Sequence, residues 1–123
     1  MTHLRDPIVA ACSGKPELRD RPLMSHTQAC QLESLFKTLA NATRLRMLHA
    51  LEREPEICVT ELSRRLEMKP QAISNQLQRL TDRGILQAER VGNRVYYQIV
   101  NPCVLSLLDR GWCLAEGTEV CPD

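Results

Sequence analysis

Cysteine is the residue type whose chemistry is most specific in this chain. Thiolates are soft ligands that select zinc, cadmium, lead, mercury and trivalent arsenic over hard ions. Arg5, Asp6 and Pro7 fall where a signal peptide would carry its apolar segment. We therefore expect a cytoplasmic protein whose reduced thiols serve metal binding or redox chemistry, not a secreted disulfide framework. The candidate ligands are the six cysteines, Cys12, Cys30, Cys58, Cys103, Cys113 and Cys121.

The elements that position these cysteines follow from the spacing of apolar residues. Residues 1–27 contain three prolines, lack periodicity and are predicted to form a flexible N-terminal arm. Order is expected from about Cys30, with a first helix whose apolar stripe has the i, i+3, i+4, i+7 spacing. A second helix follows the polar capping candidates at 41–43, carries Leu45, Leu48 and Leu51, and ends at 54–55.

The second half of the chain reads as two short helices, a hairpin and a last helix. Helices are predicted at 59–66 and 71–83, the latter with Pro70 at its first position and Gly84 as its stop. Strands at 85–89 and 95–100 flank a turn containing Gly92 and Asn93. A final helix is expected at 102–116 and a tail at 118–123. The chain is thus predicted to be mostly α with one β-hairpin, in the order α-α-α-α-β-β-α, with a single domain at 28–117.

The helix at 71–83 has one face that suits contact with DNA. Its amides, hydroxyl and arginine can make directed hydrogen bonds to base edges and phosphates. The net charge of +1 gives no general attraction to nucleic acid, so the argument rests on where the charges lie. Two short helices followed by a hairpin with a basic tip indicate a winged helix-turn-helix. The predicted DNA-binding residues are Arg64, Lys69, Gln71, Ser74, Asn75, Gln76, Gln78, Arg79, Arg90, Asn93 and Arg94.

Four segments carry a resemblance to the ArsR/SmtB family of metal- and metalloid-responsive repressors. They are LANATRLR at 39–46, EICVTEL at 56–62, KPQAISNQL at 69–77 and GNRVYY at 92–97. The resemblance spans roughly residues 30 to 115. It implies a homodimer built on the first and last helices that binds double-stranded operator DNA without metal and releases it when an inducer ion binds. Two departures stand out. Thr60 occupies the position where the family's arsenic-type motif has its second cysteine, and Asn41-Ala42 replaces the more usual aspartate-proline, which we expect to be harmless.

Three placements of the ion compete. In the first, which resembles the family's site at this helix, Cys58 and Glu61 lie one turn apart at the start of helix 59–66, and Cys12, Cys30 or His26 completes the set. In the second, Cys103 of one subunit approaches Cys113 of the other, and Cys30 supplies a third sulfur. Along one helix these two cysteines are separated by ten residues, about 15 Å, which is too far to share an ion. In the third, Cys121 joins either set.

Two further functions compete with that of an ion-responsive repressor. A thiol-based redox or reactive-sulfur sensor of the same fold would use the same cysteines to form a disulfide or polysulfide. An enzyme is not expected, because no catalytic triad order, phosphate loop or paired-carboxylate arrangement stands out. The sequence leaves open which ion acts as inducer among arsenic(III), mercury, cadmium, lead and zinc.

Overall fold

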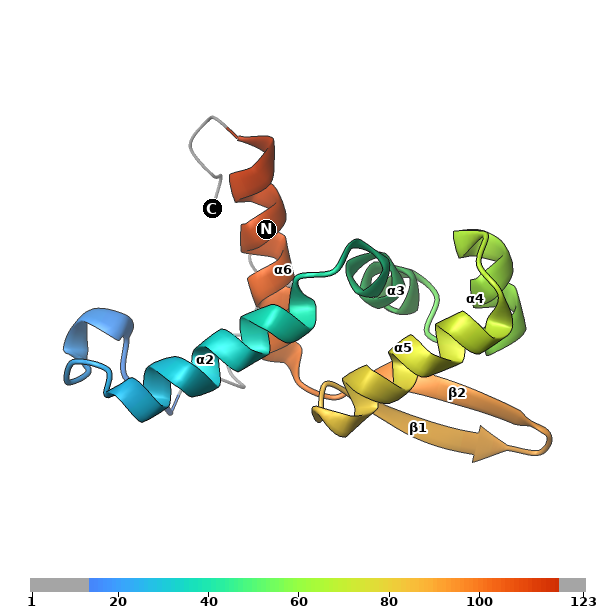
Figure 1. The fold of residues 1–123 in the computed structure, drawn as a ribbon, viewed down its shortest axis with the longest axis horizontal. Helices are drawn as coiled ribbons and strands as arrows, with labels where there is room; N and C mark the ends of the chain where they lie inside the picture. The colour runs from blue at the N-terminus through green and yellow to red at the C-terminus, as the bar shows by residue number, and fades with distance from the viewer. Residues whose placement is uncertain (1–13, 118–123) are drawn as a thin grey trace. The chain divides into compact units, whose positions relative to one another are not determined.

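The computed structural model of the chain describes residues 14–117. They contain five α-helices, a short 3-10 helix and one antiparallel pair of strands (Figure 1). The described residues divide into two compact units. One unit contains the 3-10 helix η2 (Leu18–Asp20) and the last helix, α6 (Pro102–Glu116), and the other comprises residues 23–100.

Helix α2 (His26–Leu39) begins with a capping box. The Ser25 hydroxyl accepts a hydrogen bond from the Gln28 backbone N–H at 3.1 Å, and the Gln28 side chain accepts one from the Ser25 N–H at 2.9 Å. Two otherwise orphaned backbone donors are thereby satisfied. This signal explains why the helix starts earlier than the sequence analysis expected, at His26 instead of about Cys30.

Helix α3 (Ala42–Arg53) starts where the capping candidates predicted, with the Asn41 side chain accepting from the Arg44 backbone N–H at 3.0 Å. Of the three leucines that the sequence places on this helix, Leu48 and Leu51 are buried, whereas Leu45 is 38% exposed. Met47 completes the buried face. At about 100° per residue, Leu45 lies about 60° around the helix from Leu48 and about 120° from Leu51, so it falls at the edge of that face.

Helices α4 (Val59–Leu66) and α5 (Pro70–Asp82) form the helix-turn-helix (Figure 1). Glu67 ends α4 with a left-handed backbone at φ 57°, and Pro70 occupies the first turn of α5. Gly84 follows α5 with φ 80°, as its predicted role as a stop requires. The two helices bury Leu62, Leu66, Ile73, Leu77 and Leu80.

Strands β1 (Leu86–Val91) and β2 (Arg94–Ile99) make the wing. Val91 pairs with Arg94 in the register, so only Gly92 and Asn93 remain as the turn. The predicted hairpin is confirmed, but its strands reach closer to the tip than 85–89 and 95–100. Gly92 adopts φ 64°, and glycine at the first position of a two-residue turn allows strands to pair up to the turn. Strand β1 packs against α5, and β2 against α3.

Helix α6 has the bounds predicted for the last helix. The Asn101 side chain accepts from the Cys103 backbone N–H at 2.8 Å, and Pro102 occupies the first turn. Val104 is buried, whereas Trp112 and Leu114 are 56% and 81% exposed. Among residues 14–117, no helix is long and apolar enough to cross a membrane.

Candidate DNA interface and cysteine sites

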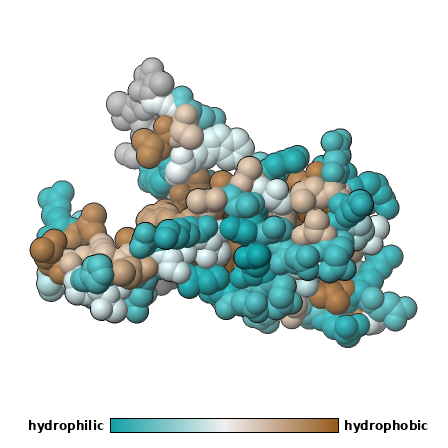
Figure 2. Space-filling model, viewed as in Figure 1, coloured by the Kyte–Doolittle hydropathy of each residue, from teal (hydrophilic) through white to brown (hydrophobic). Residues whose placement is uncertain are grey.

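Helix α5 presents a polar face to solvent. Gln71, Asn75, Gln78 and Arg79 are exposed, at the spacing of one helical face, and Ser74 is half-buried. The Gln71 amide donates to Asn75 at 3.1 Å, and the Gln78 amide donates to Asp82 at 2.9 Å. Figure 2 shows hydrophilic side chains over α5. The helix thus offers amides and a guanidinium that can exchange these exposed bonds for bonds to base edges.

Gln76 is placed differently from the other predicted contacts. It is half-buried, and its side-chain oxygen accepts a hydrogen bond from the Arg44 guanidinium at 2.7 Å. Spacing along the sequence gave no signal of this partner, because 32 residues separate the two. Gln76 therefore lies on the flank of α5 that faces α3.

Positive side chains lie on α4 and at the start of α5. Arg64 is exposed and pairs with Glu61 at 2.6 Å, and Lys69 is exposed at the N-cap of α5. Arg65 pairs with Glu54 at 2.7 Å and with Glu61 at 3.3 Å. The hydrogen bond and charge of Glu54, followed by those of Glu61, raise the pKa of Arg65 above its ordinary value. Arg65 is thus held by the protein's own carboxylates.

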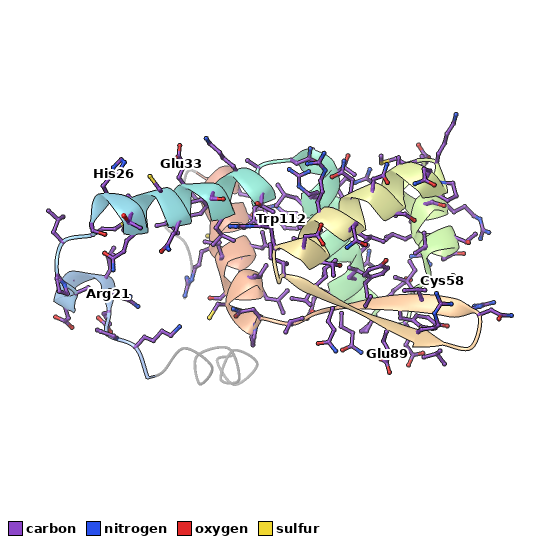
Figure 3. The ribbon with its side chains drawn as sticks, turned by 60° about the horizontal axis from the view of Figure 1, so that its bottom comes forward. Arg21, His26, Glu33, Cys58, Glu89 and Trp112 are labelled. Carbon is purple, nitrogen blue, oxygen red and sulfur yellow. The ribbon has the colours of Figure 1, made fainter. Side chains whose placement is uncertain are left out.

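The wing carries its basic residues close to the start of α4. Arg90, Asn93 and Arg94 are all exposed. Adjoining hollows lie between the wing tip and the N-terminal end of α4, and both are lined by Cys58, Glu61 and Arg94. Figure 3 shows Cys58 beside the hairpin. A group bound to Cys58 would therefore lie close to Arg94, a predicted DNA-binding residue.

Cys58 and Glu61, the pair of the first placement, both lie at the start of α4. Cys58 is a half-buried free thiol at the N-cap, and it makes no side-chain capping bond. Glu61 is half-buried and its carboxylate is held by Arg64 and Arg65. An ion at Cys58 would have to displace these arginines before Glu61 could serve as a ligand.

Cys30 lies on the exposed side of α2 and is also a free thiol. Its sulfur is 3.5 Å from Nε2 of His26, one turn earlier. The structure thus brings together two of the residues considered for completing the first placement. Figure 3 shows His26 and Glu33 on the same side of this helix.

Cys103 and Cys113 are in a different chemical form. Each is disulfide-bonded, although the sequence analysis expected free thiols. Both belong to α6, and their separation of about 15 Å along that helix excludes a bond between the two. Their sulfurs could bind an ion only after reduction, because the thiolate is the ligand form. The other two predicted ligands, Cys12 and Cys121, lie outside the described residues.

No complete ion site exists within the described part of one copy. Across residues 14–117, no group of three or more histidine, cysteine, aspartate or glutamate side chains could hold a metal ion. A site built from these residues would therefore need a second copy of the chain, or ligands from beyond this range, to complete it.

Comparisons with known proteins agree with this architecture. A model described as the MarR family matches residues 41–94, which run from the cap of α3 to the start of β2. A transcriptional repressor SmtB homologue from Synechocystis sp. is 36% identical over 69% of this chain, and the match spans 64% of that relative. The arsenical resistance operon repressor of Escherichia coli is 31% identical over 69% of this chain and 76% of its own.

A solved structure is more similar still. The crystal structure of AntR, described as an antimony-specific transcriptional repressor, matches with a TM-score of 0.72 and 57% sequence identity. The match covers 85% of this chain and 95% of that one. Helices, hairpin and their order are therefore shared over nearly the whole of that protein.

Proposed function

Because this chain belongs to the ArsR/SmtB family of winged-helix transcriptional regulators, we propose that it is a homodimeric repressor. It binds double-stranded operator DNA and releases it when a thiophilic ion binds to its cysteine thiolates. The observation that carries the DNA-binding part is the exposed amide face of α5 beside a wing with arginines at its tip. The same unit of the fold thus offers groups for base edges and for phosphates.

Homodimerisation is supported by the apolar residues that α2 leaves exposed. Leu32 and Phe36 are 39% and 46% exposed, and together with Met24 they line a shallow apolar groove along α2. Figure 2 shows hydrophobic side chains along this helix. Trp112 and Leu114 on α6 are also exposed. A second copy that covers these surfaces would remove them from water, which favours association.

For the ion we propose a soft trivalent metalloid, with antimony first and arsenic second. The chemistry of the donors supports this choice, since the candidate ligands are thiols and thiolates select soft ions. The antimony-specific repressor shares 57% of the aligned residues, and the arsenical repressor of E. coli shares 31%. Cadmium, zinc, lead and mercury, which are also thiophilic, are the comparison ions.

For the ligand set we propose Cys103 of one copy and Cys113 of its partner. One copy brings together no three suitable ligands among residues 14–117, and Glu61 beside Cys58 is already paired with two arginines. A site shared between copies does not require three ligands from one copy, and it does not use Glu61. The two cysteines have to be reduced first, as they would be in a reducing cytoplasm.

Linkage explains why such an ion would release DNA. Operator half-sites are read by two α5 helices whose separation is set by the dimer. An ion that favours a dimer arrangement mismatched to the operator weakens DNA binding by the same factor as DNA weakens ion binding.

The experiment is fluorescence anisotropy of the reduced protein on DNA from its own upstream region. We expect tight, salt-sensitive binding without ions and release on addition of antimonite or arsenite, at lower concentrations than cadmium or zinc require. Failure to prefer upstream DNA over an unrelated duplex would refute the repressor proposal. Tight binding that no ion reverses would refute only the ion-sensing part.

A second candidate function is favoured by one observation, the disulfide-bonded state of Cys103 and Cys113. In this alternative a hydroperoxide takes two electrons and two protons from a pair of thiols and leaves a disulfide, water and an alcohol. Operator release by peroxide, reversed by dithiothreitol, with no response to antimonite, would support this redox sensor over the ion sensor.

A further inference from the structure

The Arg44 side chain joins three parts of the winged-helix unit. Arg44 lies in the first turn of α3, and its Nε donates to the Thr38 carbonyl oxygen at 2.6 Å. One terminal guanidinium nitrogen donates to the Gln76 side-chain oxygen at 2.7 Å. Its own backbone N–H donates to Asn41. One partly buried residue thus connects the end of α2, the start of α3 and the middle of α5.

The hydrogen bond from Arg44 to Thr38 satisfies a carbonyl group at the C-terminal end of α2. The last four carbonyl groups of a helix have no partner within it, and Thr38 is the second-last residue of α2. A guanidinium at this end also suits the negative pole of the helix dipole. Arg44 therefore holds the start of α3 against the C-terminal end of α2. Helix α2 also carries Leu32 and Phe36, which belong to the surface proposed for dimerisation.

The bond to Gln76 fixes the orientation of an amide on the DNA-reading helix. Arginine has donors and no acceptor, so the amide oxygen of Gln76 has to face Arg44 and its NH₂ group has to face away. Glutamine reads adenine by using both groups together. With its oxygen bonded to Arg44, Gln76 has its NH₂ group left to offer to DNA. A donor of this kind suits base acceptors such as guanine O6 or thymine O4.

No carboxylate competes for Arg44. None of the ion pairs recorded within residues 14–117 involves it, and both of its side-chain acceptors are neutral amide groups. The guanidinium fork matches two separated oxygens, a geometry that the single ammonium of lysine cannot reproduce.

We propose that Arg44 is a positioning residue for operator recognition, which ties α5 to the C-terminal end of α2 through Gln76. A shift of α2 at the dimer interface is thereby transmitted to the helix that reads the bases. The proposal rests on the proposed function, because it needs an operator to read.

The test is a double-mutant cycle on operator affinity with the full-length, reduced protein. Arg44→Ala and Gln76→Ala are made separately and together, with Arg53→Ala, an exposed arginine at the far end of α3, as the matched control. We expect each single variant to bind the operator at least ~fivefold more weakly, and the double variant to be no weaker than Arg44→Ala alone. Arg44→Lys should behave like Arg44→Ala, and Arg53→Ala like the wild type.

Two further readouts separate positioning from other roles. The slope of log affinity against log salt concentration should stay unchanged in Arg44→Ala, because each phosphate contact that is lost lowers its magnitude by about 0.9. Affinity for unrelated DNA should also stay unchanged, whereas general unfolding would reduce both affinities together. A smaller slope, equal losses on both DNAs, or additive losses in the double variant would overturn the proposal. Wild-type protein that prefers no operator would instead overturn the proposed function together with it.

Discussion

At the scale of single residues, the basic side chains near α4, α5 and the wing fall into two groups. Arg65 is held by Glu54 and Glu61, so it contributes to the fold around α4. Arg94 lies exposed at the first position of β2, and none of the ion pairs recorded for residues 14–117 involves it. Arg90, also on the wing, is likewise exposed and absent from those ion pairs. We therefore propose that phosphate binding by the wing falls to Arg90 and Arg94, and we take Arg94, next to the turn, as the one to test.

Replacing Arg94 by alanine should weaken binding to operator and unrelated DNA by similar factors. The salt slope should fall in magnitude by about 1, because one phosphate contact is removed. Anisotropy titrations of both DNAs over a series of salt concentrations measure the two quantities.

The matched control for this variant is Gln98→Ala, on the same strand, where the exposed Gln98 contacts only Glu89 among its recorded side-chain bonds. Asn75→Ala on α5 should lower affinity for the operator alone and leave the slope unchanged. An Arg94→Ala protein with the wild-type slope would show that the wing tip does not touch phosphate.

At the scale of elements, the sequence is most informative where a capping or turn residue marks a boundary. Asn41, Pro70 and Asn101 each begin the helix that they predict. Helix α2 starts earlier than the apolar stripe alone indicates, because the Ser25 capping box precedes that stripe. The wing strands extend further than predicted, because the turn takes up only Gly92 and Asn93.

The sequence could not predict which side chains bond to each other when they belong to different elements. The bonds from Arg44 to Gln76 and from Arg65 to Glu54 join different elements, and no periodicity encodes them. The chemical state of Cys103 and Cys113 escapes prediction for the same reason, because oxidation depends on which sulfurs meet in space. The exposure of Leu45, at the edge of a stripe whose Leu48 and Leu51 are buried, likewise depends on neighbours that the sequence does not identify.

The turn between α4 and α5 contains a residue in an unfavourable backbone conformation. Glu67 adopts φ 57°, a left-handed region where a side chain costs about 1–2 kcal/mol and glycine costs nothing. Glu67→Gly should raise the free energy of unfolding by about 1 kcal/mol after the greater backbone entropy of glycine in the unfolded chain is subtracted. Urea denaturation followed by circular dichroism measures the change.

Glu67→Ala is the control, because alanine removes the same charge but keeps the Cβ atom. It should be no more stable than the wild type. Equal stabilisation by alanine and glycine would show that the charge of Glu67, and not its backbone conformation, is unfavourable.

At the scale of the whole molecule, the proposed function depends on a second copy of the chain. Phe36→Glu places a charge in the apolar groove of α2, and burying an unpaired charge is strongly unfavourable. We expect this variant to sediment as a monomer in analytical ultracentrifugation and to lose operator binding. Ser34→Glu adds the same charge on the opposite side of α2 and should remain dimeric. Two variants with the same dimer constant would rule out this face as the interface.

The proposed ligand set predicts how mixed dimers behave. A dimer of one Cys103→Ser copy and one Cys113→Ser copy keeps one complete pair and loses the other. It should bind about half as much antimonite as the wild type, while both variant homodimers should bind none at that site. Two differently tagged chains, purified together under reducing conditions, allow the stoichiometry to be measured by elemental analysis. Wild-type stoichiometry in all three dimers would place the ion elsewhere, with Cys58 and Cys30 the next variants.

The central claim is that a thiophilic ion and operator DNA weaken each other's binding to this protein. The most direct measurement is the affinity of the reduced wild-type protein for its upstream DNA across an antimonite titration, followed by anisotropy. The account predicts that affinity falls as antimonite rises, and that operator DNA weakens antimonite binding by the same factor. Operator affinity that is unchanged when antimonite is bound would contradict the account.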